Sequence, residues 1–465
     1  MKVIFVHGWS VTNTDTYGEL PLALSRQAPH LDIQVEHLYL AKYVSFSDEV
    51  TVKDLARGME AAVQAQVIPA LAEGERFACI THSTGGPVVR AWIQHFYADR
   101  LDQCPLGSLV MLAPANHGSA LAQLGKTKLA RMKFFLGGVE PGVGVLNWLE
   151  LGSEQSWRLN TDWIANDLLG AGIYTFVLTG QSIDRSFYDN LNSYTGEAGS
   201  DGVVRVAAAN MNYGLLRLEQ QGGKFKPPKK CLSPITALRV LPGLSHSGKD
   251  MGIMASVRAD APHPTVDATI KCLSVTNARQ YRACVKDFEQ LTAQTQEQER
   301  EKTSKSLFLF DRTFVVNRYF MLVIRIRDDD SNMLNDYDVL FTAGPHYDEN
   351  HLPKGFFVDR QRNSKSPGIL TYYMNYDVMA PWFEKREVED KFGFKICARP
   401  DEGFAHYTLA EHKGQYSKLS QYFRPNQTVM IDVILKRQVM EGVFRLTQNL
   451  APESFKNQAK GSAIE

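Results

Sequence analysis

Short apolar runs alternate with helix-like stretches along the first 285 residues. The runs are rich in Val, Ile, Leu and Phe, whereas residues 54–71 and 85–97 have helical composition. Apolar runs that alternate with helices are typical of a mostly parallel sheet covered on both faces. The pattern therefore predicts an α/β domain over residues 1–285. Its expected strands are residues 3–6, 33–40, 77–81, 109–113, 173–179 and 203–208.

The pattern changes near residue 286. Residues 286–305 are rich in Gln, Glu and Lys and poor in large apolar side chains, which predicts an exposed helix or a linker between domains. From residue 306 onward, aromatic and β-branched runs alternate with polar residues and are separated by Gly, Pro, Asn and Asp. This spacing predicts a β-sandwich-like domain over residues 306–465.

Composition narrows the function. The chain has 465 residues and a formal net charge of zero, so it shows no basic excess that would indicate a nucleic-acid partner. Its six cysteines include no CxxC pair, and we expect neither a metal nor another cofactor. Five aspartates between residues 328 and 338 fail the EF-hand spacing, which favours a solvated acidic loop over a calcium site.

The first residues and the overall hydropathy bear on location. Four apolar residues follow Lys2, fewer than the apolar core of a signal peptide needs. No run approaches the roughly 20 apolar residues of a membrane-spanning helix. We therefore expect synthesis in the cytoplasm, with export, if any, by a route that needs no cleaved signal.

The strongest chemical signal is the stretch THSTGG, residues 81–86. It follows an apolar strand and precedes a helical stretch, which is the context of a nucleophile elbow, where a serine sits on a strained turn among small residues. Ser83 is the predicted nucleophile, supported by His82 and by Gly85 at the second small position. The first small position is occupied by Thr81, a departure from the usual glycine.

A second motif ends the first strand. Val6 is followed by His7, Gly8 and Trp9. In an elbow-type site, one oxyanion N–H comes from the loop after this strand and the other from the residue after the nucleophile. The backbone amides of Trp9 and Thr84 are therefore the predicted oxyanion hole.

These motifs carry a family resemblance. FVHGW, THSTGG and LAPANHGS (residues 112–119) occur in the order found in α/β-hydrolase lipases. The N-terminal 285 residues resemble bacterial lipases, lecithin–cholesterol acyltransferase-like enzymes and inositol-deacylase-like hydrolases. The resemblance implies an α/β-hydrolase fold and esterase chemistry. A lipase-like domain with an appended domain and no signal peptide is also loosely similar to type VI secretion lipase effectors.

A serine nucleophile needs an acid and a base, in the chain order Ser, Asp or Glu, His. Asp201 lies in SDGVV before a short apolar run and matches the Asp-Gly-Val stretch that holds the triad acid in many lipases. Asp184 and Asp189 compete for this role because they follow the strand at residues 173–179. We favour Asp201 as the acid that orients the base.

Two histidines follow Asp201 in the hydrolase domain. His246 lies in a Gly- and Ser-rich loop after an apolar strand, from which an imidazole can reach Ser83. His263 lies between two prolines, a setting typical of a surface turn. We favour His246 as the base, and we interpret His117 as a structural residue.

The substrate prediction rests on the family resemblance and on residues 119–165, which are rich in Leu, Phe, Trp and Gly. This composition suits an apolar cap over an acyl chain, and it suits a pair of core helices equally well. We expect a phospholipid or another lipid ester at a membrane surface. Two alternatives stay open: an acyltransferase with the same triad, and an inactive binding or delivery module. The C-terminal domain is the predicted site of any protein partner, such as an immunity or secretion component.

Overall fold

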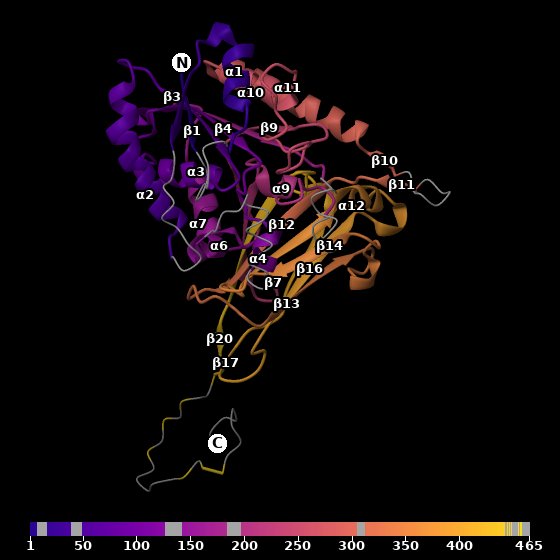
Figure 1. Ribbon diagram of the computed structural model, residues 1–465. Helices are drawn as coiled ribbons and strands as arrows, with labels where there is room; N and C mark the ends of the chain where they lie inside the picture. Colours follow the sequence, from indigo (N-terminus) through magenta and orange to yellow (C-terminus); the bar gives the residue numbers. More distant parts are fainter. Residues whose placement is uncertain are drawn as a thin grey trace.

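The computed structural model describes residues 1–6, 16–38, 49–125, 142–183, 197–304 and 312–441, with six single residues beyond them. Two sheets organise these residues, and helices surround the first (Figure 1). Within the described part of the chain, no helix has both the length and the hydropathy needed to cross a bilayer.

The first sheet has six parallel strands in the order β2-β1-β3-β4-β5-β9. Every residue of β1 and β5 is buried, because helices cover both faces of the sheet. The predicted α/β fold is therefore confirmed. The strands are β1 (Lys2–Val6), β2 (Gln34–Leu38), β3 (Phe77–His82), β4 (Leu106–Leu112), β5 (Tyr174–Thr179) and β9 (Ala237–Val240).

Alternate residues of the strands enter two separate cores. Val3 and Phe5 of β1 pack with helices α1 (Leu20–Gln27), α10 (Pro264–Leu273) and α11 (Ala278–Gln298), which lie together at the top of Figure 1. Ile4 and Val6 belong to the core on the other face. The helices there are α2 (Val52–Ala62), α3 (Gly85–Phe96), α6 (Val143–Leu149) and α7 (Glu154–Trp163), with the short α4 (Ala120–Gly125) and α9 (Val206–Ala209) nearby.

The second sheet has ten strands and mixed pairing. Its order is β13-β16-β18-β7-β6-β19-β12-β15-β14, and β8 pairs with β6. The strands are β6 (Gly214–Gln221), β7 (Lys224–Phe225), β8 (Lys229–Leu232), β12 (Tyr319–Asp328), β13 (Tyr337–Ala343), β14 (Phe357–Arg362), β15 (Ile369–Asn375), β16 (Lys391–Ala398), β18 (Ala410–Gln415) and β19 (Thr428–Leu435).

This second sheet curls over a core of its own. Phe341, on one terminal strand, packs against Tyr372 and Phe357 from the opposite end of the sheet, with ring centroids 5.1 and 5.6 Å apart. The curl brings two halves of the sheet face to face, so the C-terminal region has the β-rich, sandwich-like character predicted from its pattern. Helices α12 (Tyr376–Phe383) and α13 (Tyr416–Leu419) flank it.

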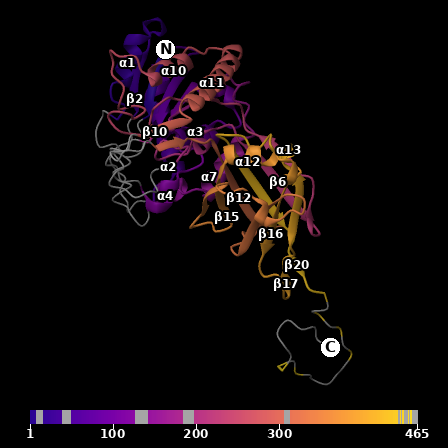
Figure 2. The same ribbon diagram turned by 90° about the vertical axis from the view of Figure 1, so that its right-hand side faces the viewer.

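Two small ribbons lie outside the large sheets. One pairs β10 (Glu301–Ser304) with β11 (Arg312–Val315), and the other pairs β17 (Ala405–His406) with β20 (Gln438–Val439). The second ribbon projects from the far end of the second sheet (Figure 2).

The division of the chain differs from the predicted boundaries in two places. Residues 286–298, expected in a linker, continue helix α11, which packs on β9 through the buried Phe288 and Thr292. Strands β6 to β8, expected in the first domain, pair with the second sheet. The first difference arises because α11 is polar in overall composition, although one of its faces is buried. The second arises because the sequence of a strand does not show which sheet the strand joins.

The predicted cap at about residues 119–165 lies only partly within the described residues. Helices α6 and α7, which form most of the described part, share a core with α2 and α3. These two helices are therefore core elements. The basic residues of this stretch, Lys126, Lys128, Arg131 and Lys133, lie outside the described residues.

Candidate active site

Ser83 lies on the turn between strand β3 and helix α3. Its φ of 53° is in the left-handed region that side-chain-bearing residues rarely adopt. The turn is held by a 3.0 Å hydrogen bond from the Ser83 amide to the carbonyl of Leu112 on β4. A strained serine at the carboxyl end of a central parallel strand is the geometry that the elbow motif predicts.

Small residues make this turn possible. A Cβ atom on Gly86 would lie 2.9 Å from Cβ of Pro114, closer than real side chains approach. A Cβ atom on Gly85 would lie 3.2 Å from Cβ of Thr81. The fully buried Thr81 thus fits where a glycine is usual, because Gly85 leaves the opposing position empty.

The structure brings Ser83, His246 and Asp201 into one hydrogen-bonded chain. Nε2 of His246 lies 3.2 Å from Oγ of Ser83, and Nδ1 lies 2.9 Å from Oδ2 of Asp201. Ser83 is 8% exposed, His246 2% and Asp201 0%. Each follows a different strand of the first sheet, at the carboxyl edge where α/β folds place their ligand sites.

The Asp201 carboxylate is held by its own loop. Oδ1 accepts hydrogen bonds from the amides of Val203 and Val204 at 3.0 and 2.7 Å, which leaves Oδ2 for the imidazole. The His246 amide also donates to the Asp201 carbonyl at 2.9 Å. Backbone and side-chain contacts therefore both join the acid to the base.

The predicted oxyanion hole is only partly within the described residues. Thr84 directly follows Ser83 and leads into the twelve-residue helix α3, whose N-terminal amides carry partial positive charge. His7, Gly8 and Trp9 lie outside the described residues. Val6, the last residue of β1, pairs in register with Thr81, so β1 ends beside the strand that leads into the elbow.

The other histidines have different surroundings. His263 caps helix α10: its Nδ1 accepts from the Thr265 amide, and its Nε2 contacts Oγ of Ser256 at 2.9 Å. His82 packs against the His246 ring with centroids 4.6 Å apart. Burial, with a smaller effect of His246, holds the pKa of His82 well below its usual value, so His82 stays neutral. The competing acids Asp184 and Asp189 lie outside the described residues.

His117 is buried against the edge of the Tyr213 ring, with centroids 4.8 Å apart. Burial, and secondarily the Arg90 guanidinium, lower its pKa to about 3. A neutral histidine in the core suits the structural role predicted for it.

No group of three or more His, Cys, Asp or Glu side chains that could hold a metal occurs among the described residues. Four of the five aspartates between residues 328 and 338 have protein partners. Asp328 accepts from the Asn332 amide and from the Tyr407 hydroxyl. Asp336 and Asp338 form ion pairs with Arg399.

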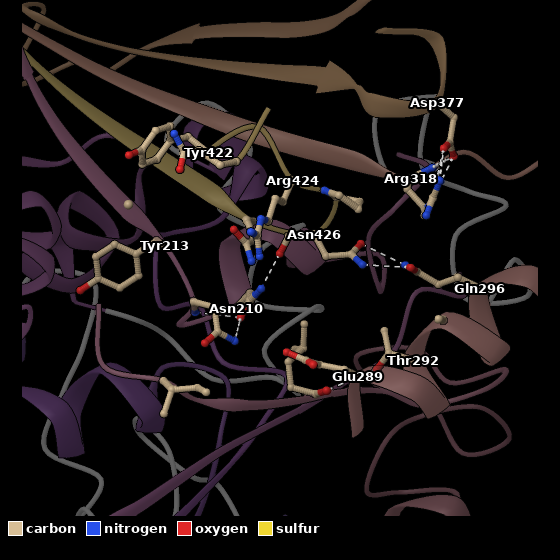
Figure 3. A pocket seen from close by; sticks show the side chains of 18 of the residues that line it. Asn210, Tyr213, Glu289, Thr292, Gln296, Arg318, Asp377, Tyr422, Arg424 and Asn426 are labelled. Carbon is tan, nitrogen blue, oxygen red and sulfur yellow. Dashed lines mark hydrogen bonds and ion pairs between the residues drawn. The ribbon is translucent and has the colours of Figure 1, made fainter. Parts of the chain in front are cut away.

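A separate pocket of about 850 Å³ is lined by residues of both sheets and of helix α11, and Ser83, Asp201 and His246 are not among them (Figure 3). Across it, Asn426 accepts from Asn210 and exchanges hydrogen bonds with Gln296. Its charged lining holds three basic and three acidic side chains, so the lining carries no net charge. The charged residues are Arg300, Arg318, Arg424, Glu289, Glu297 and Asp377.

The fold and the position of this site define the class: the protein is an α/β-hydrolase of the lipase and esterase type. No protein-family model matches the chain, and no curated protein shows a similar sequence. Solved structures, in contrast, include similar proteins. The chain is 47% identical to phospholipase PlaB from Legionella pneumophila in complex with thio-NAD, with a TM-score of 0.92 and 100% of both chains covered.

A second structure of the Legionella phospholipase is 48% identical, with a TM-score of 0.93, and covers 100% of this chain and 99% of that one. Identity of this extent over the whole length shows the family. The chain belongs to the PlaB phospholipase family and is a hydrolase of lipid esters. The resemblance to α/β-hydrolase lipases that the motifs carry is thereby confirmed.

Proposed function

We propose that this protein hydrolyses acyl ester bonds of phospholipids through Ser83, His246 and Asp201. The observation that carries the proposal is the buried hydrogen-bonded chain from Ser83 Oγ through the His246 ring to Asp201. Nucleophile, base and orienting acid are thereby all within hydrogen-bonding distance of their neighbours, as two-step acyl transfer requires.

The first half-reaction acylates Ser83. As Oγ attacks the carbonyl carbon of the ester, Nε2 of His246 takes the hydroxyl proton. Asp201 holds Nδ1–H and stabilises the imidazolium that forms. The tetrahedral intermediate then breaks its bond to the alcohol oxygen, which receives the proton from His246. The lysophospholipid leaves, and the acyl group remains on Ser83.

The second half-reaction releases the fatty acid. A water molecule gives a proton to His246 and attacks the acyl carbon. The bond to Ser83 Oγ breaks, and the serine regains its proton from the imidazolium. In both halves, negative charge develops on the carbonyl oxygen. The Thr84 amide, at the start of helix α3, and the predicted Trp9 amide are the donors that we assign to it.

The phospholipid headgroup enters this proposal through the family relationship, because the related Legionella enzyme is a phospholipase. Export by type VI secretion and an immunity or secretion partner at the C-terminal domain stay predictions. An acyltransferase would use the same residues and differ only in the acceptor of the second half-reaction.

The test measures fatty-acid release from phospholipid vesicles by the full-length protein. We expect turnover by the wild type and by Ser274→Ala, which alters an exposed serine, and loss of turnover in Ser83→Ala. Adding a long-chain alcohol distinguishes a transferase, which would form the new ester in preference to free acid. Equal rates for wild type and Ser83→Ala would overturn the proposal.

A further inference from the structure

The loop that carries Asp201 rests against the second sheet. The described part of the loop runs from Glu197 to Arg205, the residue before helix α9, and a backbone bridge joins Ser200 to Arg205. Asp201 is at the closed tip, and its amide donates to the Val204 carbonyl at 3.1 Å. The position of this loop therefore sets the position of the carboxylate that faces His246.

A buried arginine joins the loop to the second sheet. Arg205 is 1% exposed, and its guanidinium forms a two-point contact with Glu197 through Nε and Nη2, at 2.8 and 2.7 Å. Nη2 also donates to Asp359 on β14. Burial alone would lower the pKa of Arg205, but Glu197 and Asp359 raise it overall, so the guanidinium stays charged.

Tyr373 on β15 contacts the same loop in two ways. Its ring lies under the Arg205 guanidinium, 4.2 Å from centroid to Cζ. Its hydroxyl is 3.0 Å from the Ala198 carbonyl and 3.2 Å from that of Gly199. Gly199 has φ 76°, and any side chain there would collide with Tyr373 and Tyr319. The chain therefore passes directly over these rings.

These contacts leave the loop little freedom of its own. A buried cation that loses a carboxylate partner is costly and tends to move toward solvent. Arg205 is four residues from Asp201 within a closed loop, so its displacement would shift the acid. Shifts near 1 Å are enough to reduce catalysis by up to about 100-fold.

We propose that Asp359 and Tyr373 of the second sheet are positioning residues that hold the triad acid Asp201 in register through Arg205. The proposal rests on the proposed function. It gives the C-terminal domain a part in the hydrolytic site, because the Asp359 carboxylate and the Tyr373 ring both contact the loop that carries Asp201. Asp359 lies 154 residues after Arg205 in the chain.

The sharpest test is Tyr373→Phe, which keeps the ring under Arg205 and removes only the hydroxyl. Tyr372→Phe is the matched control, since Tyr372 is the next residue of β15 and its hydroxyl faces the Val339 carbonyl within the second sheet. We expect kcat of Tyr373→Phe to fall about threefold to tenfold at unchanged KM, with no change for Tyr372→Phe.

The ionic contact is tested by Asp359→Asn, with Asp338→Asn as control because Asp338 pairs with Arg399 away from the loop. We expect a loss in kcat of about 10- to 100-fold for Asp359→Asn and none for the control. Thermal unfolding of all four variants shows which are folded. If Asp359→Asn does not fold, Tyr373→Phe alone decides the proposal.

A double-mutant cycle shows whether the effect passes through the acid. In an Asp201→Asn background, Tyr373→Phe should reduce the residual rate by less than about twofold, because the group it positions is already disabled. A purely structural effect would reduce both backgrounds equally and would overturn the proposal, as would a wild-type rate for Tyr373→Phe. Failure of the proposed function gives a different result, an active Ser83→Ala variant.

Discussion

At the scale of single residues, the site contains one strained backbone position and several buried polar side chains. Ser83 holds a positive φ that its surroundings must stabilise, and His82 and His117 are imidazoles buried where a proton would be costly. The grouping of Ser83, Asp201 and His246 in space could be predicted from the sequence, because motif, strand context and chain order all restrict the choice. Asp359 and Tyr373 could not, since no local pattern relates them to the Asp201 loop.

Protonation of His117 should contribute to acid destabilisation. In the unfolded chain its pKa is near 6.5, whereas in the folded protein it is about 3. Above pH 6.5 the residue is neutral in both states. As the pH falls below 6.5, the unfolded state takes up a proton that the folded state excludes, so the free energy of unfolding decreases.

The measurement is urea unfolding of wild type and His117→Gln at pH 7.0 and 4.5. We expect the loss of stability between these pH values to be smaller in the variant, by about 2 kcal/mol. The comparison of slopes removes any constant cost of the substitution itself. Identical losses in the two proteins would show that His117 does not contribute.

Helices and strands were predictable where their apolar periodicity is local. The elements at residues 77–81, 85–97 and 173–179 match β3, α3 and β5 closely. Helix α11 was underestimated, because its buried stripe includes Thr292 and Thr295, which sequence patterns count as polar. The Thr292 hydroxyl accepts a hydrogen bond from the amide of Val240, the last residue of β9, at 3.0 Å. Composition alone does not show this contact between the helix and the strand.

The close packing of helix α3 on β4 predicts opposite effects for two helical glycines. Gly86→Ala places a methyl group against Pro114 and Met111, and we expect a loss of about 1–3 kcal/mol in unfolding free energy. Gly58 of helix α2 is exposed and has open space around it. Gly58→Ala should therefore stabilise the protein by about 0.5–1 kcal/mol. Chemical denaturation measures both, and equal effects would contradict the packing.

At the scale of the whole molecule, the two sheets share one buried core, in addition to the core that the second sheet encloses by itself. Tyr319, Met321 and Met430 of the second sheet belong to the same buried cluster as Trp157 and Ala207. Strand β6, from the middle of the chain, pairs with β19 near its end. The sequence predicted two domains separated by a linker. Local composition indicates only the average exposure of a segment, whereas the shared core depends on contacts between residues that are distant in sequence.

This shared core predicts that the two sheets unfold together. We expect a single calorimetric transition, with the van 't Hoff enthalpy equal to the calorimetric one. A chain that ends at residue 304 should lack a folded hydrolase domain, because it loses the partner of β6 and exposes the cluster. Two resolved transitions, or a soluble and active fragment, would contradict this expectation.

The central claim is that Ser83 is the nucleophile, activated by His246 and oriented by Asp201. Its most direct test is the rate at which a fluorophosphonate labels the full-length protein, with the modified peptide located by mass spectrometry. We predict one label on Ser83, none in Ser83→Ala, strongly slowed labelling in His246→Ala and Asp201→Asn, and a wild-type rate in His263→Ala. Labelling of another residue, or its loss in His263→Ala alone, would contradict the claim.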